Sequence, residues 1–334
     1  MTTTYTAKTT GEAVARDSQT RIAGRTVLVT GTSPGGLGAT FATTIAPFGP
    51  AHIILASRNT AKAEHVAKDI AAAAPAVKTS VVKLDLSSQV QVREAAAEIL
   101  KISTHIDILV NNAAVMATSY STTVDGIERQ FGTNHIGHFL LTNLLLPKLL
   151  EVRAEGEVST KEPLRVVNVA SDGFRFGWVR YEDINFGDGA TYEGWLAYGQ
   201  SKSANMLFSR SLAKKLGSRG VVSVSLHPGV IITTNLSRGL AMEDISELGV
   251  LDRKLGNRSY WDNVVNLKST AEGVATHVFA AFDASLDAPE VNGSYLEDSH
   301  VEDVGNVKSW ARDSVDAEKL WNLSEGLVSQ KFDY

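Results

Sequence analysis

Thr26-Val-Leu-Val-Thr-Gly-Thr-Ser-Pro-Gly-Gly-Leu-Gly38 joins a short apolar segment to a glycine-rich turn. Its first five residues are apolar or β-branched, which is typical of a buried strand. Helix-like sequence then runs from Leu37 to about Phe48. Glycine lets a phosphate group approach the backbone, and a helix N-terminus offers free N–H groups and a favourable dipole. The segment therefore predicts a dinucleotide-binding turn.

The alternation of apolar and helix-like segments continues along the chain. Further buried strands are expected at 52–56, 79–84, 106–110, 164–169 and 221–226. The longest helix-like segments between them are 124–150 and 196–216. Strands that are apolar throughout and alternate with helices indicate a parallel sheet with helices on both faces. We therefore expect one doubly wound α/β domain of the Rossmann type at 21–334, preceded by a flexible polar tail at 1–20.

Three long segments do not fit this alternation, and the first two are interpreted as insertions. The first, at 172–195, is rich in aromatic residues: Phe174, Phe176, Trp178, Tyr181, Phe186, Tyr192 and Trp195. The second, at 235–268, contains Tyr260 and Trp261, and residues 306–330 resemble a C-terminal helix. Long segments in a compact domain are usually functional lids or disordered, and the aromatic side chains favour lids. The first insertion fits the core of a lid and a substrate pocket equally well.

The composition excludes several classes of function. Of 334 residues, 43% are hydrophobic and 21% charged, so a sizeable core is available. A net charge of −5 disfavours nucleic acid or an anionic membrane as the main partner. The absence of cysteine rules out disulfides and thiolate chemistry. The most apolar run, 139–150, is too short to span a membrane, and the N-terminus is polar, so we expect a cytoplasmic protein.

The end of the second expected strand indicates which dinucleotide is bound. NAD sites place a carboxylate there for the ribose hydroxyls, whereas NADP sites place a cation against the 2′-phosphate. This strand ends in Leu55-Ala-Ser-Arg58, with no acidic residue and with an arginine at its tip. Since a guanidinium group suits bidentate phosphate binding, Arg58 favours NADP(H). The alternative is a solvated surface arginine.

Tyr198 and Lys202 lie four residues apart in an expected helix, and therefore on one side of it. A tyrosine hydroxyl can stabilise an oxyanion and donate a proton, but its ordinary pKa of about 10 is high for work at neutral pH. A nearby ammonium group lowers the pKa of a phenol, so the pair suits proton transfer during hydride transfer to a carbonyl. The alternative is a core tyrosine beside a surface lysine.

Other polar residues lie near the same expected edge of the sheet. Ser171 follows the strand at 164–169, where catalytic groups of open α/β sheets collect, although it could also be a helix or turn cap. His135 and His138 have the spacing of metal ligands, but no third ligand is evident, so packing is favoured. His227 is likewise interpreted as structural.

The order of these motifs resembles the short-chain dehydrogenase/reductase family. The matching pieces are the turn at 30–38, Leu84-Asp-Leu86, Asn111-Asn-Ala-Ala114, Asn134, Ser171, the segment 198–202 and His227-Pro-Gly229. The segment 134–142, Asn-His-Ile-Gly-His-Phe-Leu-Leu-Thr, looks like the retinol-dehydrogenase-like and protochlorophyllide-reductase-like branches. In this chain four residues separate the first two glycines, where the family has three, a form associated with fungal members. Ala114 replaces the usual glycine.

The resemblance implies a role for each matching residue. Tyr198 would be the general acid, Lys202 would tune it and bind ribose, Ser171 would bind the substrate oxygen, and Asn134 would hold the water of a proton relay. Asp85 and Leu86 would flank the adenine, Asn112 and Ala113 would line the ribose, and Val230 and Thr233 would contact the nicotinamide amide. The other implied cofactor-binding residues are Gly31, Ser33, Gly36, Leu37, Gly38, Ser57, Arg58, Tyr198 and Lys202. The resemblance also allows a homodimer through the two long helices.

These observations predict an NADPH-dependent oxidoreductase that interconverts a ketone or aldehyde with an alcohol. The aromatic insertions suggest an apolar substrate, aromatic or polycyclic in kind. One alternative is reduction of an activated carbon–carbon double bond. The other is a non-catalytic NADP-binding sensor or scaffold, which would have no need of the complete set of Asn134, Ser171, Tyr198 and Lys202. No metal is expected.

Overall fold

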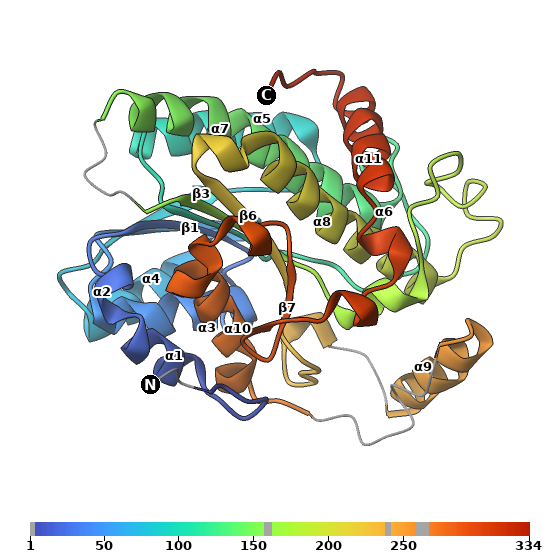
Figure 1. Cartoon of the computed structure of the whole chain (residues 1–334), viewed down its shortest axis with the longest axis horizontal. Coiled ribbons are helices and arrows are strands. Elements are labelled where there is room, and N and C mark those ends of the chain that lie inside the picture. Colours follow the sequence, from blue (N-terminus) through green and yellow to red (C-terminus); the bar gives the residue numbers. More distant parts are fainter. Residues whose placement is uncertain (1–3, 157–161, 238–241, 258–266) are drawn as a thin grey trace.

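The computed structural model describes residues 4–156, 162–237, 242–257 and 267–334 (Figure 1). Its centre is an eight-stranded sheet in the order β3-β2-β1-β4-β5-β6-β7-β8, which is parallel except for the β7–β8 pair. The strands are β1 Thr26–Thr30, β2 His52–Ser57, β3 Lys78–Lys83, β4 Ile108–Asn111, β5 Leu164–Val169, β6 Val221–His227, β7 Tyr295–Glu297 and β8 His300–Val301. The expected doubly wound sheet is confirmed, with its topological switch point between β1 and β4.

Helices cover both faces of this sheet in a single Rossmann-fold domain (Figure 1). One face carries α1 Gly11–Asp17, α3 Leu37–Ile45, α4 Thr60–Ala73 and α10 Thr270–Phe282. The opposite face carries α5 Gln89–Ile102, α7 Gly137–Ala154, α8 Gly194–Leu216 and α11 Ser314–Leu327. Because side chains alternate along a strand, Val27 and Val29 enter the first core and Leu28 the second.

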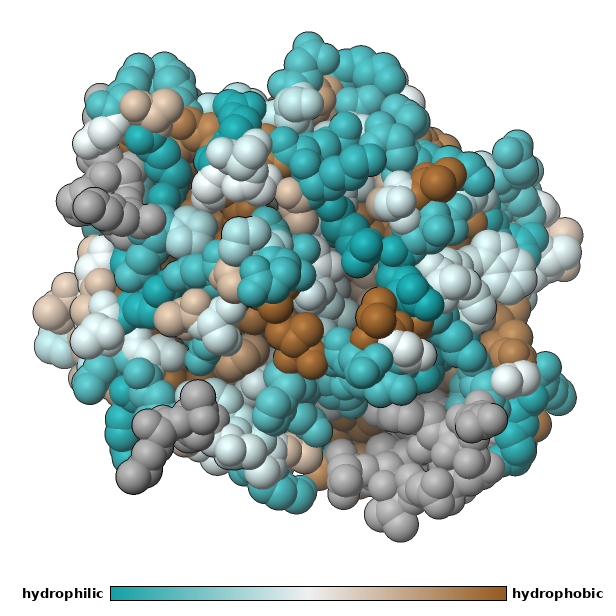
Figure 2. Space-filling view, in the orientation of Figure 1, coloured by the Kyte–Doolittle hydropathy of each residue, from teal (hydrophilic) through white to brown (hydrophobic). Residues whose placement is uncertain are grey.

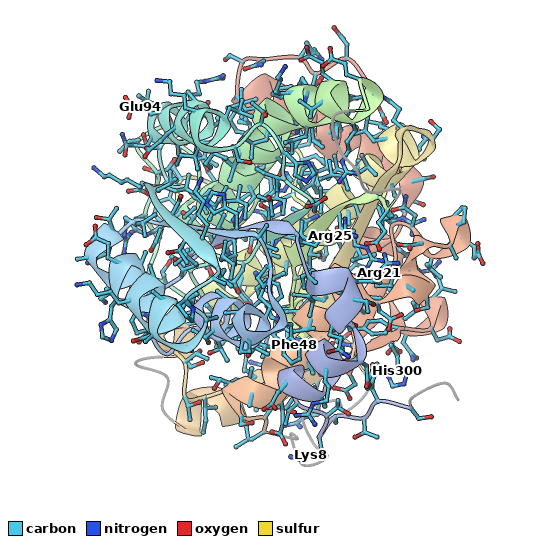
Figure 3. The ribbon with its side chains drawn as sticks, turned by 90° about the vertical axis from the view of Figure 1, so that its left-hand side faces the viewer. Lys8, Arg21, Arg25, Phe48, Glu94 and His300 are labelled. Carbon is cyan, nitrogen blue, oxygen red and sulfur yellow. The ribbon has the colours of Figure 1, made fainter. Side chains whose placement is uncertain are left out.

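The expectation of a flexible tail over residues 1–20 is wrong for the part that the structure describes. The ring of Tyr5 packs edge-on against Phe279 of α10 at 5.9 Å between centroids. The Lys8 ammonium lies 3.6 Å from Glu272 at the start of α10, and Lys8 can be located in Figure 3. Thr10 caps α1, which buries Val14 completely. This short helix is stable through packing on α10, which its polar sequence does not reveal.

A second short helix, α2 (Gln19–Ile22), leads from α1 to β1. Arg21 on this helix lies 2.9 Å from Asp287, and Arg25 just before β1 lies 3.5 Å from Asp107 (Figure 3). The segment before β1 is therefore tied to the amino end of the sheet, opposite the glycine-rich turn.

Several element boundaries differ from those expected. The segment from Val124 is a turn rather than a helix. Helical structure begins with α6 (Arg129–Phe131), passes through a π-helical turn at Gly132–Ile136 and continues as α7. The C-terminal helix α11 begins at Ser314, after two 3₁₀ turns. The elements α10, β7 and β8 were not predicted.

The two expected insertions have different structures. The first begins with a 3₁₀ helix at Asp172–Phe176 and continues as a series of turns to the start of α8. The second contains α9 (Met242–Lys254), which lies at the margin of the molecule (Figure 1). Tyr260 and Trp261 lie outside the described residues.

The C-terminal residues cover the aromatic side of α7 and α8. The ring of Trp321 in α11 lies 5.1 Å from Phe139 of α7 and 6.2 Å from Phe208 of α8. Phe332 packs against the same Phe139 ring at 5.8 Å. A homodimer through the two long helices would have to use another part of their surface.

The molecular surface in the view of Figure 2 is mostly hydrophilic, and its apolar side chains form small separate patches. Among the described helices, none combines the length and the apolar character needed to cross a membrane. Most of the large apolar side chains lie in the cores that flank the sheet.

Candidate active site

Ser171, Tyr198 and Lys202 meet at the carboxyl edge of the sheet, as the sequence predicts. Ser171 comes shortly after β5, and the α8 residues Tyr198 and Lys202 are 4% and 2% exposed. The Ser171 hydroxyl lies near enough to the Tyr198 phenol to lower the pKa of that phenol. The Lys202 ammonium donates to the carbonyl oxygen of Val169 at 2.8 Å and lies 5.4 Å from the centre of the Tyr198 ring. The three side chains form one cluster, in which Tyr198 and Lys202 are buried and Ser171 is partly exposed.

Gly173 is a site residue that the sequence analysis missed. A Cβ atom at this position would lie 2.8 Å from the Tyr198 ring and 3.4 Å from the Ser171 hydroxyl oxygen. Its own N–H donates to that hydroxyl at 3.1 Å. Only glycine allows the backbone after Ser171 to lie flat against the phenol. A glycine two residues after the expected serine was the only signal in the sequence.

Burial dominates the electrostatics of the pair in α8. It raises the pKa of Tyr198 to about 12, although the nearby Ser171 hydroxyl acts in the opposite direction. It lowers the pKa of Lys202 to about 7. The expectation that Lys202 lowers the phenol pKa is therefore wrong for this structure, because burial disfavours charge on both side chains. The Tyr198 phenol therefore keeps its proton at neutral pH.

The residue next to Ser171 is anchored from the opposite side. The backbone N–H of Asp172 donates to Nδ1 of His227 at 3.2 Å, and its carboxylate pairs with Arg175. Burial lowers the pKa of His227 to about 3, so its ring is neutral and accepts this bond through Nδ1. Burial also raises the pKa of Asp172 to about 7. The structural role expected for His227 thus consists of holding the turn that carries Ser171.

Asn134 lies in the π-helical turn before α7, and its side chain joins two parts of the site. Its Oδ1 accepts from the N–H of Val115 at 2.8 Å, and its Nδ2 donates to the carbonyl of Val115 at 2.9 Å. The same Nδ2 donates to the hydroxyl of Ser201 at 2.9 Å. The carboxamide therefore ties the loop after β4 to α8 within one turn of Tyr198. The proton relay through Asn134 stays a prediction.

His138 connects Asn134 to the end of β1. The Thr30 hydroxyl oxygen accepts from the N–H groups of Asn112 and Ala113 at 2.9 and 3.0 Å, so its proton is free for Nε2 of His138 at 2.9 Å. Nδ1 of His138 then carries the ring proton and donates to the Asn134 carbonyl at 3.0 Å. Burial lowers the pKa of His138 to about 4, which keeps it neutral. His138 therefore does more than fill space in the core, because it connects the end of β1 to the backbone at Asn134.

The other histidine of this pair, His135, joins the π-helical turn before α7 to α11 by packing and by a contact with a hydroxyl group. Nε2 of His135 lies 2.8 Å from the Ser324 hydroxyl of α11, and its ring packs against Phe131 and Phe208. Within the described ranges, no group of three potential metal-ligating side chains occurs.

The glycine-rich turn between β1 and α3 is shaped to receive a phosphate. Gly31 has a φ of +77°, and a Cβ there would lie 2.7 Å from Cα of Ala113. The additional residue of the turn is accommodated by Gly35, which has a φ of +76°, while Gly36 becomes the N-cap of α3 and donates to the Ser33 carbonyl at 3.0 Å. The first N–H groups of α3, from Leu37 onward, have no partner within the helix. These residues fit a dinucleotide pyrophosphate.

Comparison with known proteins agrees with this geometry. A family model for short chain dehydrogenases matches residues 25–181. The chain is 36% identical to retinol dehydrogenase 14 of Mus musculus, over 91% of this chain and 86% of that protein. The chain belongs to the short-chain dehydrogenase/reductase family. It is also 38% identical to the chloroplastic short-chain dehydrogenase TIC 32 A of Brassica napus, over 83% of this chain and 81% of that protein.

A solved structure has a similar fold. A protein from Mycobacterium paratuberculosis matches with a TM-score of 0.70 at 33% identity, over 96% of this chain and 98% of that one. This short-chain dehydrogenase/reductase is thus an oxidoreductase of the retinol-dehydrogenase-like branch, and its family binds nicotinamide cofactors.

The residues expected at the adenosine end of the cofactor lie at the same edge of the sheet. Ser57 ends β2 and is buried, whereas Arg58 is exposed and has no ion pair or hydrogen bond with any described residue. Oδ1 of Asp85 accepts from the N–H of Ser87 at 3.0 Å, which fixes the turn after β3, and Leu86 is buried. Their contacts with a cofactor stay predictions.

The segment after β6 carries the residues expected at the nicotinamide. The Val230 carbonyl accepts from the N–H of Lys268 at 2.9 Å, and Thr233 is exposed. The side chain of Asn235 donates to the Pro34 carbonyl at 2.8 Å, so this segment is tied to the glycine-rich turn. On the other side of that turn, Nδ2 of Asn112 donates to the Thr30 carbonyl at 2.8 Å.

Proposed function

We propose that this enzyme uses NADP(H) to interconvert a ketone or aldehyde with an alcohol on an apolar small molecule. The observation that carries the proposal is the cluster in which Gly173 and Ser171 lie against the Tyr198 phenol and Lys202 lies over its ring. The cluster supplies two hydroxyl donors for one oxygen atom, beside a turn that fits a dinucleotide.

NADPH, when bound, supplies the hydride for the carbonyl carbon. As negative charge grows on the carbonyl oxygen, the hydroxyls of Ser171 and Tyr198 donate to it. Tyr198 then transfers its proton to that oxygen, and its high pKa keeps it protonated until this step. The phenolate so formed is stabilised by Ser171 and by the nearby Lys202, which regains its proton when anionic groups approach. In the oxidation direction the same residues act in reverse.

The preference for NADP(H) is supported by Arg58. It follows β2, where an NAD-binding site would place a carboxylate, and it is free to contact a 2′-phosphate. Fluorescence titration of the purified protein with NADPH and NADH tests this. We expect clearly tighter binding of NADPH. Equal affinities would overturn the cofactor preference, and binding of neither would overturn the function.

Product analysis tests the reaction type. Incubation with NADPH and an α,β-unsaturated aldehyde offers both a carbonyl group and an activated double bond. We expect the unsaturated alcohol, because the hydroxyls of Ser171 and Tyr198 lie close enough together to donate to the same carbonyl oxygen. A saturated aldehyde would identify a double-bond reductase instead, and tight NADPH binding without turnover of a broad set of carbonyls would identify a sensor or scaffold.

Two further parts of the proposal concern assembly and location. A homodimer would use surfaces of α7 and α8 other than the aromatic side, which Trp321 and Phe332 cover. Size-exclusion chromatography with light scattering measures this directly. A cytoplasmic location is also proposed, and fractionation of the producing cells checks it.

A further inference from the structure

Most aromatic residues of the insertion at 172–195 are accounted for by packing or by a fixed hydrogen bond. Phe174, Phe176 and Phe186 are buried in the core. The hydroxyl groups of Tyr181 and Tyr192 donate to the carbonyls of Asp316 and Thr118 at 2.9 and 2.8 Å. Trp178 is 55% exposed and packs edge-on against Trp310, where it lines a surface groove with neighbouring charged residues. These residues have structural roles in the insertion, so Trp195 is the aromatic residue of this segment that packing and hydrogen bonds do not account for.

Trp195 is in direct contact with the catalytic tyrosine. It lies in the first turn of α8, three residues before Tyr198 and therefore on the same side of the helix. The two ring centroids are 6.1 Å apart and the rings are nearly perpendicular, at 85°. The ring of Phe176 supports the indole from behind at 6.2 Å. Trp195 remains partly exposed, and its indole N–H makes no hydrogen bond with the described residues.

The loop after β4, which contains Val115 and Ala117, contacts the start of α8 next to Trp195 and is fixed by hydrogen bonds. A Cβ at Gly194 would lie 3.4 Å from Cα of Ala117, so the loop touches the start of α8. The N–H of Ala117 donates to Oε1 of Gln130 at 2.9 Å, and Nε2 of Gln130 donates to the Gly194 carbonyl at 2.8 Å. Asn134 clamps Val115 in the same loop. The indole and the loop are thus fixed relative to each other and to the phenol.

We propose that Trp195 binds the substrate and selects flat, conjugated or aromatic carbonyl compounds. The proposal rests on the proposed function and deepens it by naming the substrate class. A flat ring attached to the reacting carbonyl can lie against the indole while its oxygen reaches Ser171 and Tyr198. Aromatic contacts add to the gain from burial alone, and the flat face of an indole favours a flat ring over a thicker saturated one.

Trp195→Leu tests this with two aldehydes of similar size, 2-naphthaldehyde and its saturated decalin counterpart. We expect kcat/KM for 2-naphthaldehyde to fall about tenfold, mainly through KM, and kcat/KM for the decalin aldehyde to change less than about twofold. Trp195→Phe keeps most of the preference for the flat substrate. Trp178→Leu is the matched control, since it removes a tryptophan of the same insertion away from Tyr198, and it leaves both substrates unchanged.

The outcomes separate a binding role from a structural one. Equal losses on both aldehydes in Trp195→Leu, or a fall in kcat alone with a shifted pH profile, would mean that the indole only supports Tyr198, and would overturn the proposal. A wild-type enzyme that reduces the decalin aldehyde as well as the flat one would also overturn it. A wild-type enzyme that binds NADPH but reduces no carbonyl at all would instead overturn the proposed function.

Discussion

The catalytic cluster and the adenosine end of the cofactor site lie on one edge of the sheet but differ in construction. Tyr198 and Lys202 are almost completely buried, and the Lys202 ammonium donates a hydrogen bond to the Val169 carbonyl. At the adenosine end Arg58 is exposed, and no described residue forms an ion pair with it. Proton transfer needs atoms in place before substrate arrives, whereas binding groups can be ordered by the ligand. The cluster should therefore be sensitive to small steric changes, and the adenosine end only to loss of charge.

Removal of the Tyr198 hydroxyl is the largest expected effect. Tyr198→Phe keeps the ring that packs against Gly173 and Trp195 but removes the proton donor. We expect turnover of a carbonyl substrate to fall about 10³-fold, since general acid catalysis contributes on that order. NADPH affinity should change less than about twofold. Single-turnover kinetics and a fluorescence titration measure the two quantities, and undiminished turnover would remove Tyr198 from the mechanism.

A single methyl group at Gly173 tests how closely the cluster is packed. Gly173→Ala places a Cβ 2.8 Å from the Tyr198 ring, so the ring must move. We expect kcat/KM to fall about 10²-fold, because a displacement on the order of 1 Å has that cost. The free energy of unfolding should fall by about 1–3 kcal/mol through overpacking. Denaturant unfolding and steady-state kinetics check both effects.

Gly326→Ala is the matched control for this substitution. Gly326 lies in α11, and a Cβ there would have no neighbour within 4 Å. Activity should stay unchanged, and stability should rise slightly because alanine favours helix. Full activity of Gly173→Ala would show that the turn after Ser171 can move without cost.

The positions of the candidate catalytic residues were predictable because their signals are local. Tyr198 and Lys202 are neighbours on one helix and Ser171 follows an apolar strand, and all three match motifs of the family that the sequence resembles. Gly173 was missed because its need for a bare backbone arises from Tyr198, which only the fold brings near. The pKa of Lys202 was beyond prediction for a similar reason: burial determines it, and burial belongs to the tertiary structure.

The same distinction explains the fold. The strands at the centre of the sheet are apolar throughout, and the turn at Gly31 is rich in glycine. The parallel sheet was predicted from these local sequence patterns. Helix α1 has only seven residues and is stabilised by Val14 packed on α10, from the other end of the chain. Strands β7 and β8 have three and two residues, too few for a pattern.

Loss of charge at the adenosine end should have a smaller and more selective effect. Arg58→Ala removes a cation that can pair with the 2′-phosphate of NADPH. We expect NADPH affinity to fall about tenfold and NADH affinity to change little, since NADH has no such phosphate. Lys62→Ala, in the adjoining α4, is a control with the same loss of charge on an exposed residue. Fluorescence titrations of the three proteins give the comparison, and equal losses for both cofactors would refute this role for Arg58.

The smallest expected effect links the two regions through Lys202. Its pKa of about 7 means that the free enzyme loses the ammonium proton as pH rises above 7. The anionic cofactor and its ribose favour the ammonium form and raise this pKa, so binding above pH 7 takes up a proton. Affinity for NADPH should therefore fall by about fivefold between pH 7 and 8.

The neighbours of Lys202 decide how this measurement is controlled. His138 and Tyr198 do not titrate in this range, because their pKa values are about 4 and about 12. Asp172, with a pKa of about 7, does titrate there, so Lys202→Met is needed to isolate the lysine. Calorimetry in buffers of different ionisation enthalpy measures proton uptake directly. Uptake that persists in Lys202→Met would assign the proton to Asp172, whereas its loss would show that the buried lysine couples cofactor binding to the catalytic cluster.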